Sequence, residues 1–526
     1  MENVCPSTFG RRPSKRVTIS MPPTRNPISS DVSTSRRDAD DAPRSALDPS
    51  PEVADVVVIG SGFSGLAAAL EAAECSGGKA RVLVLEKMST PGGNSVIDEG
   101  MLSVANSPQQ SARHIADSPD LLANDMLENG EHLNDPSKVN YVALHSEALY
   151  DWTTKRLGVE WLPIVTWAGG HSVPRTLTVR TGSGREIYEK LIRAVRESGV
   201  EIRLNAYVEA FLTDASGEVV GLRVREGYAF PDAESGTVRE IRFRRGLCLC
   251  YGGFGADVAY RMRFNRQLTA DYDTTNQPGA TGELWREAER IGCAMIEASR
   301  IQCTPWSNPK EKGMGSGWLF SDYVGADYGL WVDGNGQRFV NELSNRKTAS
   351  DAILELHRLG LKAIAVGSRI SKEKLDQLRP GYMDRMLERG LINAYDTIEA
   401  LEAAWGIPAG ALQATVRNFN AMIRRRRDTE FFRPLTVAKP LEDGPWYAAE
   451  MRPKVHHCMG GLLTDTLGRV RNAATGRAMR GLYAAGECAG GVHGACRMGS
   501  CAILDCLVMG RTIGRLAAET RPESQD

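Results

Sequence analysis

Short runs of consecutive apolar residues recur near both ends of the chain, a pattern typical of strands buried on both faces of a parallel sheet. They lie within 56–59, 81–85, 246–251 and 479–484, and glycine or an acidic residue follows each range within two positions. Between the first two, residues 66–73 are rich in alanine and have strong helix propensity. This alternation of strands and helix predicts an α/β protein.

The remaining pattern predicts further elements. A β section with a hairpin runs to about 243, with strands at 200–204 and 329–333. Helices are predicted at 138–157, 184–198, 346–358, 371–389, 396–405, 410–425 and 500–519. The last of these is apolar on more than one side, so we expect it to be buried against the sheet.

A glycine turn follows the first apolar run. Gly60, Gly62 and Gly65 form a GxGxxG pattern between strand and helix, where a dinucleotide pyrophosphate needs a tight turn, close backbone approach and close helix packing. The N–H groups and positive dipole end of the helix then face the anion. Glu86, after the second strand, is placed to bond ribose hydroxyls. The segment predicts a dinucleotide site and leaves NAD, FAD and an ordinary βαβ unit open.

Composition narrows the class of protein. The chain has 526 residues, more than one compact core, so we expect two or three domains. A net charge of −1 gives no global field for nucleic acid or an anionic membrane. Eleven scattered cysteines without CxxC spacing predict free thiols in a reducing, cytoplasmic setting and no metal site. No apolar stretch reaches ~18 residues, so no membrane span is expected.

Residues 1–51 have a different composition. They are rich in Ser, Pro, Arg and Asp without hydrophobic periodicity, which predicts a disordered tail. Two arginine pairs occur there, but no hydrophobic region follows either, which argues against a twin-arginine signal. A transit peptide is the alternative.

Several longer motifs follow one another in a fixed order. They are Gly60–Gly65, Glu86-Lys87, Gly92–Ser95, Gly169–Arg175, Thr275–Gly279, Arg338–Glu342 with Arg346, His456–Gly461, Gly481–Glu487 and Gly490–Arg497. Together they resemble the flavoprotein subunit of soluble fumarate reductases of the flavocytochrome c type, a family with relatives that reduce urocanate, acrylates and cinnamates. The resemblance covers residues 52–520.

The resemblance implies a discontinuous Rossmann-like FAD-binding domain, at 52–298 and 459–526, with an inserted α+β capping domain at 299–458 that closes over the isoalloxazine. FAD would be held non-covalently. The residues implied to bind it are Gly60, Gly62, Phe63, Ser64, Gly65, Glu86, Lys87, Gly92, Gly93, Asn94, Ser95, Gly100, Met101, Gly252, Gly253, Gly486, Glu487, Ala502 and Ile503.

In this family, hydride passes from flavin N5 to one carbon of an activated double bond, and an arginine delivers the proton to the other. Arg346 matches that arginine, while His457 and Arg497 match the pair that holds the substrate carboxylate. A planar guanidinium suits a carboxylate because it can bind both oxygens. As an acid, arginine needs a proton relay, since its pKa exceeds ~12. Without the family resemblance, the alternative is that the two arginines form surface salt bridges and that His457 is a hydrogen-bonded core histidine.

The chain departs from the family where the substrate is selected. Thr304 replaces a histidine, Ser321 and Asp322 replace threonine and glutamate, and Gly325 stands in place of a relay arginine. Thr304 and Ser321 are therefore candidate substrate-binding residues, and Asp322 is a candidate catalytic residue. We expect a substrate with at most one carboxylate and a neutral distal part. The nearby aromatic residues either line that end or belong to the core: Trp306, Trp318, Tyr323 and Tyr328.

Two other functions remain open at this stage. One is an FAD-dependent dehydrogenase of a ring ketone or ketosteroid-like substrate, with Tyr323 and Tyr251 as candidate base and carbonyl polariser. The other is a flavin-binding protein without turnover. We expect a small-molecule substrate. The family's haem domain is not recognisable, so we also expect an external electron donor or acceptor.

Overall fold

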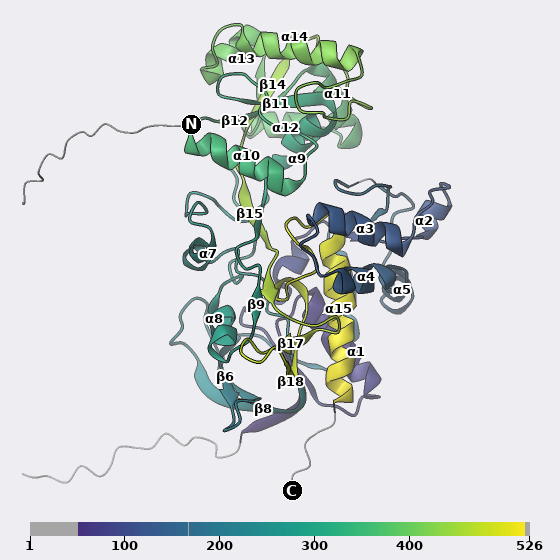
Figure 1. Ribbon diagram of the computed structural model, residues 1–526, viewed down its shortest axis with the longest axis vertical. Helices are drawn as coiled ribbons and strands as arrows, with labels where there is room; N and C mark the ends of the chain where they lie inside the picture. Colours follow the sequence, from purple (N-terminus) through teal and green to yellow (C-terminus); the bar gives the residue numbers. More distant parts are fainter. Residues whose placement is uncertain (1–50, 167, 521–526) are drawn as a thin grey trace, which may run out of the picture. The chain divides into compact units, whose positions relative to one another are not determined.

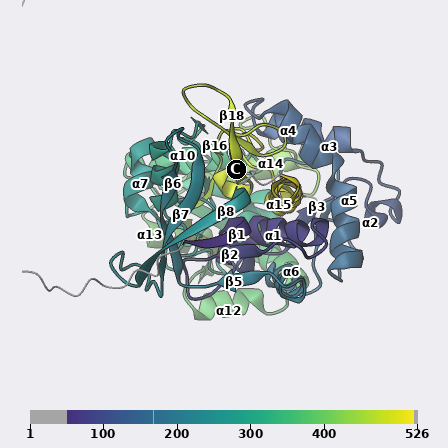
Figure 2. The ribbon, with the colours of Figure 1, turned by 90° about the horizontal axis from the view of Figure 1, so that it is seen from below.

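A largely parallel sheet carries the apolar runs from both ends of the chain. The computed structural model describes residues 51–166 and 168–520, so all but the last residue of the predicted tail lies outside it. The strand order is β17-β18-β8-β1-β2-β5, and β6 and β7 extend from β8. Figure 2 shows β18, β8, β1, β2 and β5 side by side in this order. The bounds are β1 Glu52–Ile59, β2 Val82–Leu85, β5 Glu201–Arg203, β6 Ala206–Thr213, β7 Val219–Glu226, β8 Thr237–Leu249, β17 Arg469–Arg471 and β18 Ala478–Ala484.

Alternate side chains of these strands enter two different hydrophobic cores. In β1, Val56 and Val58 join the core formed with the helices, whereas Val57 and Ile59 join the core on the other face. Both faces are covered, which explains why the strands read as unbroken apolar runs. The predicted α/β class is confirmed.

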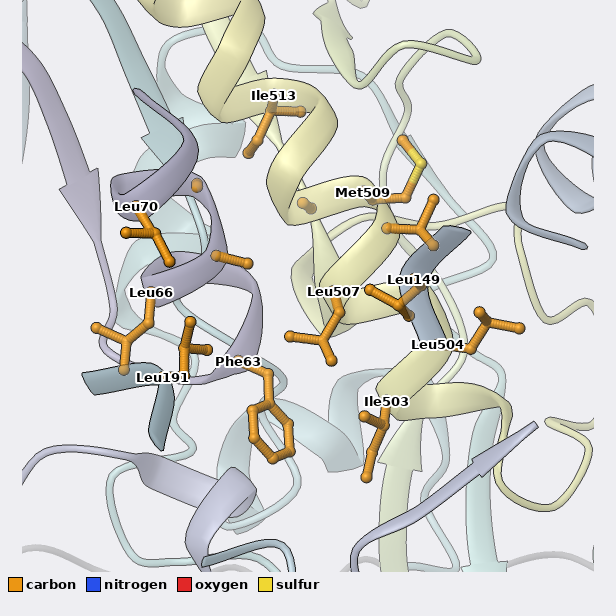
Figure 3. Close-up of a cluster of buried hydrophobic side chains, with 14 of the residues drawn as sticks. Phe63, Leu66, Leu70, Leu149, Leu191, Ile503, Leu504, Leu507, Met509 and Ile513 are labelled. Atoms are coloured by element: carbon orange, nitrogen blue, oxygen red, sulfur yellow. The ribbon is translucent and has the colours of Figure 1, made fainter. Parts of the chain in front are cut away.

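Helices α1 (Phe63–Cys75), α6 (Arg185–Glu197) and α15 (Cys501–Glu519) share the first core. Figures 1 and 3 show α15 beside α1. Their backbones nearly touch, because a Cβ built on Gly514 would lie 2.1 Å from Ala68 O. The helix also reaches the sheet, where a Cβ on Gly246 of β8 would lie 2.8 Å from Ala517 Cβ. The last helix is therefore buried, as predicted, but mainly against another helix.

A second, antiparallel sheet lies in the middle of the sequence. Its order is β11-β12-β14-β13, with bounds β11 Gly329–Asp333, β12 Ala363–Gly367, β13 Asn393–Tyr395 and β14 Trp446–Met451. The helices of this region are α9 Trp318–Tyr323, α10 Arg346–Arg358, α11 Arg369–Leu378, α12 Tyr382–Glu388, α13 Ile398–Trp405 and α14 Ala411–Arg424. Before and after it, β10 (Ile301–Thr304) and β15 (Lys454–Cys458) pair antiparallel. The domain boundaries stay a prediction.

Further helices and strands lie outside these two sheets. The helices are α2 Pro108–Ser111, α3 Pro119–Asn129, α4 Pro136–Leu144, α5 Ser146–Asp151, α7 Val258–Phe264 and α8 Glu283–Arg290; the strands are β3 Met101–Ser103, β4 Thr176–Thr178, β9 Met295–Ile296 and β16 Gly461–Leu462. In the part of the chain described, no helix combines the length and the apolar character needed to cross a bilayer.

Two predicted helices are interrupted. The helix expected at 371–389 is wrong as a single element, because it divides into α11 and α12 at Pro380-Gly381. Proline disfavours helical backbone before it, and Gly381 has a φ of +68°. The helix expected at 138–157 divides at His145 into α4 and α5, and a π-helical turn follows. By contrast, the helix predicted at 346–358 coincides with α10.

The contact between α1 and α15 gives a stability prediction. Gly514→Ala forces a methyl group into the backbone of α1, so we expect overpacking to cost about 1–3 kcal/mol and to lower the thermal midpoint. Arg515→Ala, on the exposed side of the same helix, is the matched control and should leave the midpoint almost unchanged. Equal midpoints for the two variants would contradict this packing.

Candidate active site

A cavity opens at the edge of the parallel sheet where the strands end. Gly60, Glu86, Gly252 and Glu487 line it from the ends of four different strands. The predicted cofactor residues that line the cavity are Gly60, Gly62, Phe63, Ser64, Glu86, Lys87, Gly92, Gly93, Asn94, Ser95, Met101, Gly252, Gly253, Glu487, Ala502 and Ile503. Ligands of open α/β sheets bind at this edge.

Three predicted cofactor glycines do not line the cavity: Gly65, Gly100 and Gly486. Gly65 instead lets α1 pack on the glycine turn, because a Cβ there would lie 2.0 Å from Gly60 O. This is the role the third glycine of the pattern has when a helix must approach its strand closely.

The residues present fit a dinucleotide. The N-cap of α1 is Gly62, which has no side chain to accept from the first turn; the Phe63 N–H donates to Ser95 Oγ (2.9 Å), and this helix end lines the cavity. Glu86 Oε2 accepts hydrogen bonds from Ser61 N–H (3.2 Å) and Oγ–H (2.7 Å), and Oε1 accepts one from Met88 N–H (2.9 Å). The carboxylate is thus fixed at the wall with acceptor capacity left for hydroxyl groups. Ile97 is 54% exposed and lines the same cavity, where a flat ligand would cover it.

Two guanidinium groups reach the cavity from different parts of the chain. Arg346 is the first residue of α10, and Arg497 lies in the loop before α15. Within the described residues, Arg497 hydrogen-bonds to Met498 and His456, Arg346 lies on Trp306, and neither guanidinium takes part in an ion pair. Burial and the other guanidinium lower the pKa of Arg497 to about 10, and burial lowers the pKa of Arg346. Unpaired buried cations are costly, so this arrangement suits an anionic ligand.

His456 connects one of these cations to the protein. Its Nε2 accepts a hydrogen bond from Arg497 Nη2 (3.0 Å), so Nδ1 carries the proton and donates to Thr275 Oγ1 (2.7 Å). Burial and the two nearby guanidiniums hold the pKa of His456 well below its usual value. The imidazole is therefore neutral and orients Arg497.

The family resemblance implied a different role, in holding the substrate carboxylate with Arg497, for the neighbouring residue His457. Both histidines line the cavity, although successive residues of a regular strand point to opposite faces. In β15, His457 pairs with Gln302 while Val455 pairs with Cys303, so His456 is the extra residue of a bulge. Bulges redirect side chains, and nothing in the two-histidine pattern indicates this one.

Arg346 is held by an aromatic face. Its guanidinium lies 5.0 Å from the centre of the Trp306 ring, and Asn345 caps α10 by accepting from Thr348 N–H (2.9 Å). An arginine in the first turn faces the positive end of the helix dipole, which is unfavourable for stability. The charges of Asp322 and Glu99 favour its protonated form.

Of the other residues predicted for the substrate site, one lines the cavity and two do not. Thr304 lines the cavity, and its buried hydroxyl has no hydrogen-bond partner within the described residues. Ser321 and Asp322 do not line it; Ser321 O accepts from Trp331 Nε1 (2.9 Å). A Cβ on Gly325 would lie 2.4 Å from that same Nε1, so an indole fills the space beside it.

None of the four aromatic side chains suggested for the distal end lines the cavity in the described part of the chain: Trp306, Trp318, Tyr323 and Tyr328. Trp306 and Tyr323 pack on the core of the antiparallel sheet.

Two acidic residues at the site were missed. Asp98 and Glu99 follow the Gly92–Ser95 motif and line the cavity. Burial raises the pKa of Asp98 to about 7 and also raises the pKa of Glu99. An acidic pair in a loop is ordinarily solvated, so the sequence offers no signal for them. Within the described residues, no group of three His, Cys, Asp or Glu side chains is arranged to hold a metal ion.

The fold and this cavity are those of a protein that binds a dinucleotide cofactor. The model of the FAD binding domain family matches residues 55–503, and the chain belongs to that family. FAD is thus its cofactor.

Two relatives and one solved structure narrow the family further. The chain is 36% identical to the acrylate reductase flavoprotein subunit of Shewanella woodyi, over 88% of this chain and 90% of the relative. It is 33% identical to fumarate reductase (cytochrome) of Shewanella frigidimarina, over 89% and 77%. A solved open conformation of a flavocytochrome c3 fumarate reductase superposes with a TM-score of 0.72 and 29% identity, covering 89% of this chain and 79% of that one. The protein is an FAD-dependent oxidoreductase of the fumarate reductase-like family.

The pKa of Asp98 gives a pH prediction for the cofactor-free protein. Its folded pKa of about 7 lies above the ordinary aspartate value of 3.8, so between these two pH values folding takes up a proton. The free energy of unfolding should therefore fall as pH rises from about 4 to about 7 and level off above. Asp98→Asn should flatten this slope in urea titrations, whereas exposed Asp271→Asn should not. An unchanged slope for Asp98→Asn would refute the assignment.

Proposed function

We propose that this enzyme reduces an activated carbon–carbon double bond of an enoate, with Arg346 as the proton donor. When bound, reduced FAD supplies the hydride. The observation that carries the proposal is the pair of guanidiniums, Arg346 and Arg497, that share one cavity without a carboxylate partner in the described residues. Hydride addition to an enoate builds negative charge toward its carboxylate, and fixed cations stabilise that charge most in the transition state.

Arg497 would bind the substrate carboxylate. Its backbone N–H donates to Gln302 Oε1 (2.7 Å), and Nη1 donates to Met498 O (3.3 Å), so the side chain is held before substrate arrives. Its Nε has no partner in the described part of the chain and is free to donate. His456 and His457 add neutral imidazoles to the same wall.

Arg346 would give its proton to the second carbon. Burial lowers its pKa, which makes release of the proton less unfavourable. Asp322 and Glu99, whose charges both act on Arg346, are candidates for returning the proton. This route replaces the arginine that the family would place at Gly325.

The cavity favours a substrate with a single carboxylate. Thr304 is neutral, and the acidic pair Asp98 and Glu99 would repel a second carboxylate once ionised. Acrylate- and cinnamate-type acids fit this description better than dicarboxylates do. We further propose an external electron donor and a cytoplasmic location.

The dehydrogenase alternative has less support. Tyr251 lines the cavity, and its buried hydroxyl has no partner within the described residues. Its proposed companion, Tyr323, does not line the cavity. A flavin-binding protein without turnover would have no use for two unpaired guanidiniums in the cavity, because they only reduce stability.

Replacement of Arg346 tests the proton donor. Arg346→Gln should bind FAD normally but reoxidise the photoreduced flavin with acrylate about 10²–10⁴-fold more slowly, the usual contribution of a general acid. Arg358→Gln, at the exposed end of the same helix, is the control and should react like wild type. The assay is anaerobic stopped-flow absorbance. If Arg346→Gln reacts at the wild-type rate, Arg346 is not the proton donor. If saturated ketones bleach the oxidised flavin, the enzyme is a dehydrogenase.

Substrate choice tests the single-carboxylate proposal. The kcat/KM for acrylate or cinnamate should exceed that for fumarate at least tenfold, because Thr304 offers no cation to a second carboxylate. Thr304→His should narrow the ratio, whereas Thr304→Asn should preserve it. The proposal fails if the wild-type enzyme reduces fumarate as efficiently as the monocarboxylates.

A further inference from the structure

A histidine–aspartate pair lies behind His457, outside the residues so far given a function. The rings of His457 and His493 meet edge to face, with centroids 5.4 Å apart and planes at 83°. On its other side, His493 Nε2 lies 3.4 Å from Asp505 Oδ2, which is within ion-pair distance but without hydrogen-bond geometry. The exposed fractions of the His493 and Asp505 side chains are 6% and 5%, so both are removed from water.

The loop that carries His493 is clamped by a segment distant in sequence. Lys138 Nζ donates to Gly490 O (2.7 Å), Asp135 N–H donates to Gly491 O (2.7 Å), and Asn134 Nδ2 donates to Val492 O (2.8 Å). Three consecutive carbonyl groups before His493 are thereby fixed. Lys138 is only 1% exposed, so its ammonium group is committed to this contact.

His457 itself has little else to orient it. Its Nδ1 is buried without a hydrogen-bond partner in the described residues, and its side chain lines the cavity. Burial and the charges of Arg497 and the two neighbouring histidines hold the pKa of His457 well below its usual value. A neutral ring with an unbonded nitrogen keeps one orientation only where packing imposes it.

We propose that His493, braced by Asp505 and the clamped loop, is a positioning residue that fixes the orientation of the His457 ring in the cavity. Asp505 fixes His493, and the edge of His493 fixes His457. Replacement of either His493 or Asp505 should let His457 adopt more than one orientation and tautomer. The inference depends on the proposed function only for its effect on carboxylate binding.

The primary test is NMR of the FAD-loaded enzyme with ¹⁵N-labelled histidine. The chain has eight histidines, and His457→Ala assigns the relevant signal by its loss. His493→Ala and Asp505→Asn should shift or broaden the His457 signal toward mixed tautomers. His145→Ala removes a half-buried ring that packs against Tyr141 outside the cavity, and it should leave the His457 signal unchanged. An unchanged signal in both test variants overturns the proposal, and Asp505→Asn keeps the test valid if His493→Ala fails to fold.

The second readout is the binding of propionate, measured by the change it causes in the visible flavin spectrum. We expect His493→Ala to raise the Kd for propionate about tenfold. His493→Phe, which retains a flat ring, should recover part of the lost affinity. In a His457→Ala background, His493→Ala should add no further loss, because the effect passes through His457. A full additional loss there overturns the proposal. If wild-type enzyme binds no propionate, the proposed function fails, while the NMR result still decides the positioning role.

Discussion

The structure depends on keeping two guanidinium groups in one cavity with no carboxylate at ion-pair distance from either in the described residues. Removing such charges from water is costly unless hydrogen bonds or other charges compensate. Here the compensation is partial: the backbone of Arg497 is anchored to Gln302, its side chain is oriented by His456, and Arg346 lies on the face of Trp306. The remaining cost is what an anionic substrate relieves, so the same feature that lowers stability creates affinity.

Topology explains why residues from the whole chain meet at this point. Parallel strands place all their carboxyl ends at one edge, and the strand order brings β18, from the end of the chain, next to β8 and β1. The glycine turn after β1 and Glu487 after β18 therefore line one cavity although they are more than 400 residues apart. Close contact between α1 and α15 at Gly514 holds these two ends together.

Features set by local chemistry could be predicted from the sequence. Continuous apolar runs gave β1 and β2, the glycine spacing gave the turn, and α10 coincides with its predicted range because its periodicity and Asn345 cap agree. Features set by pairing between distant segments could not. The bulge at His456 depends on the register of β15 against β10, and the burial of Asp98 depends on a cavity built from other segments. The sequence likewise did not indicate that the Trp331 indole fills the space beside Gly325.

The balance of charge within the cavity connects specificity with proton supply. Two guanidiniums face two carboxyl groups whose pKa values are raised by burial, so these groups hold protons more readily than exposed acids do. In the proposed complex, a substrate carboxylate would supply the negative charge that the arginines lack. A second carboxylate would have to lie in a cavity whose cations are already neutralised, with Thr304 unable to add another. The proposed selection for one carboxylate therefore rests on this arrangement of charges.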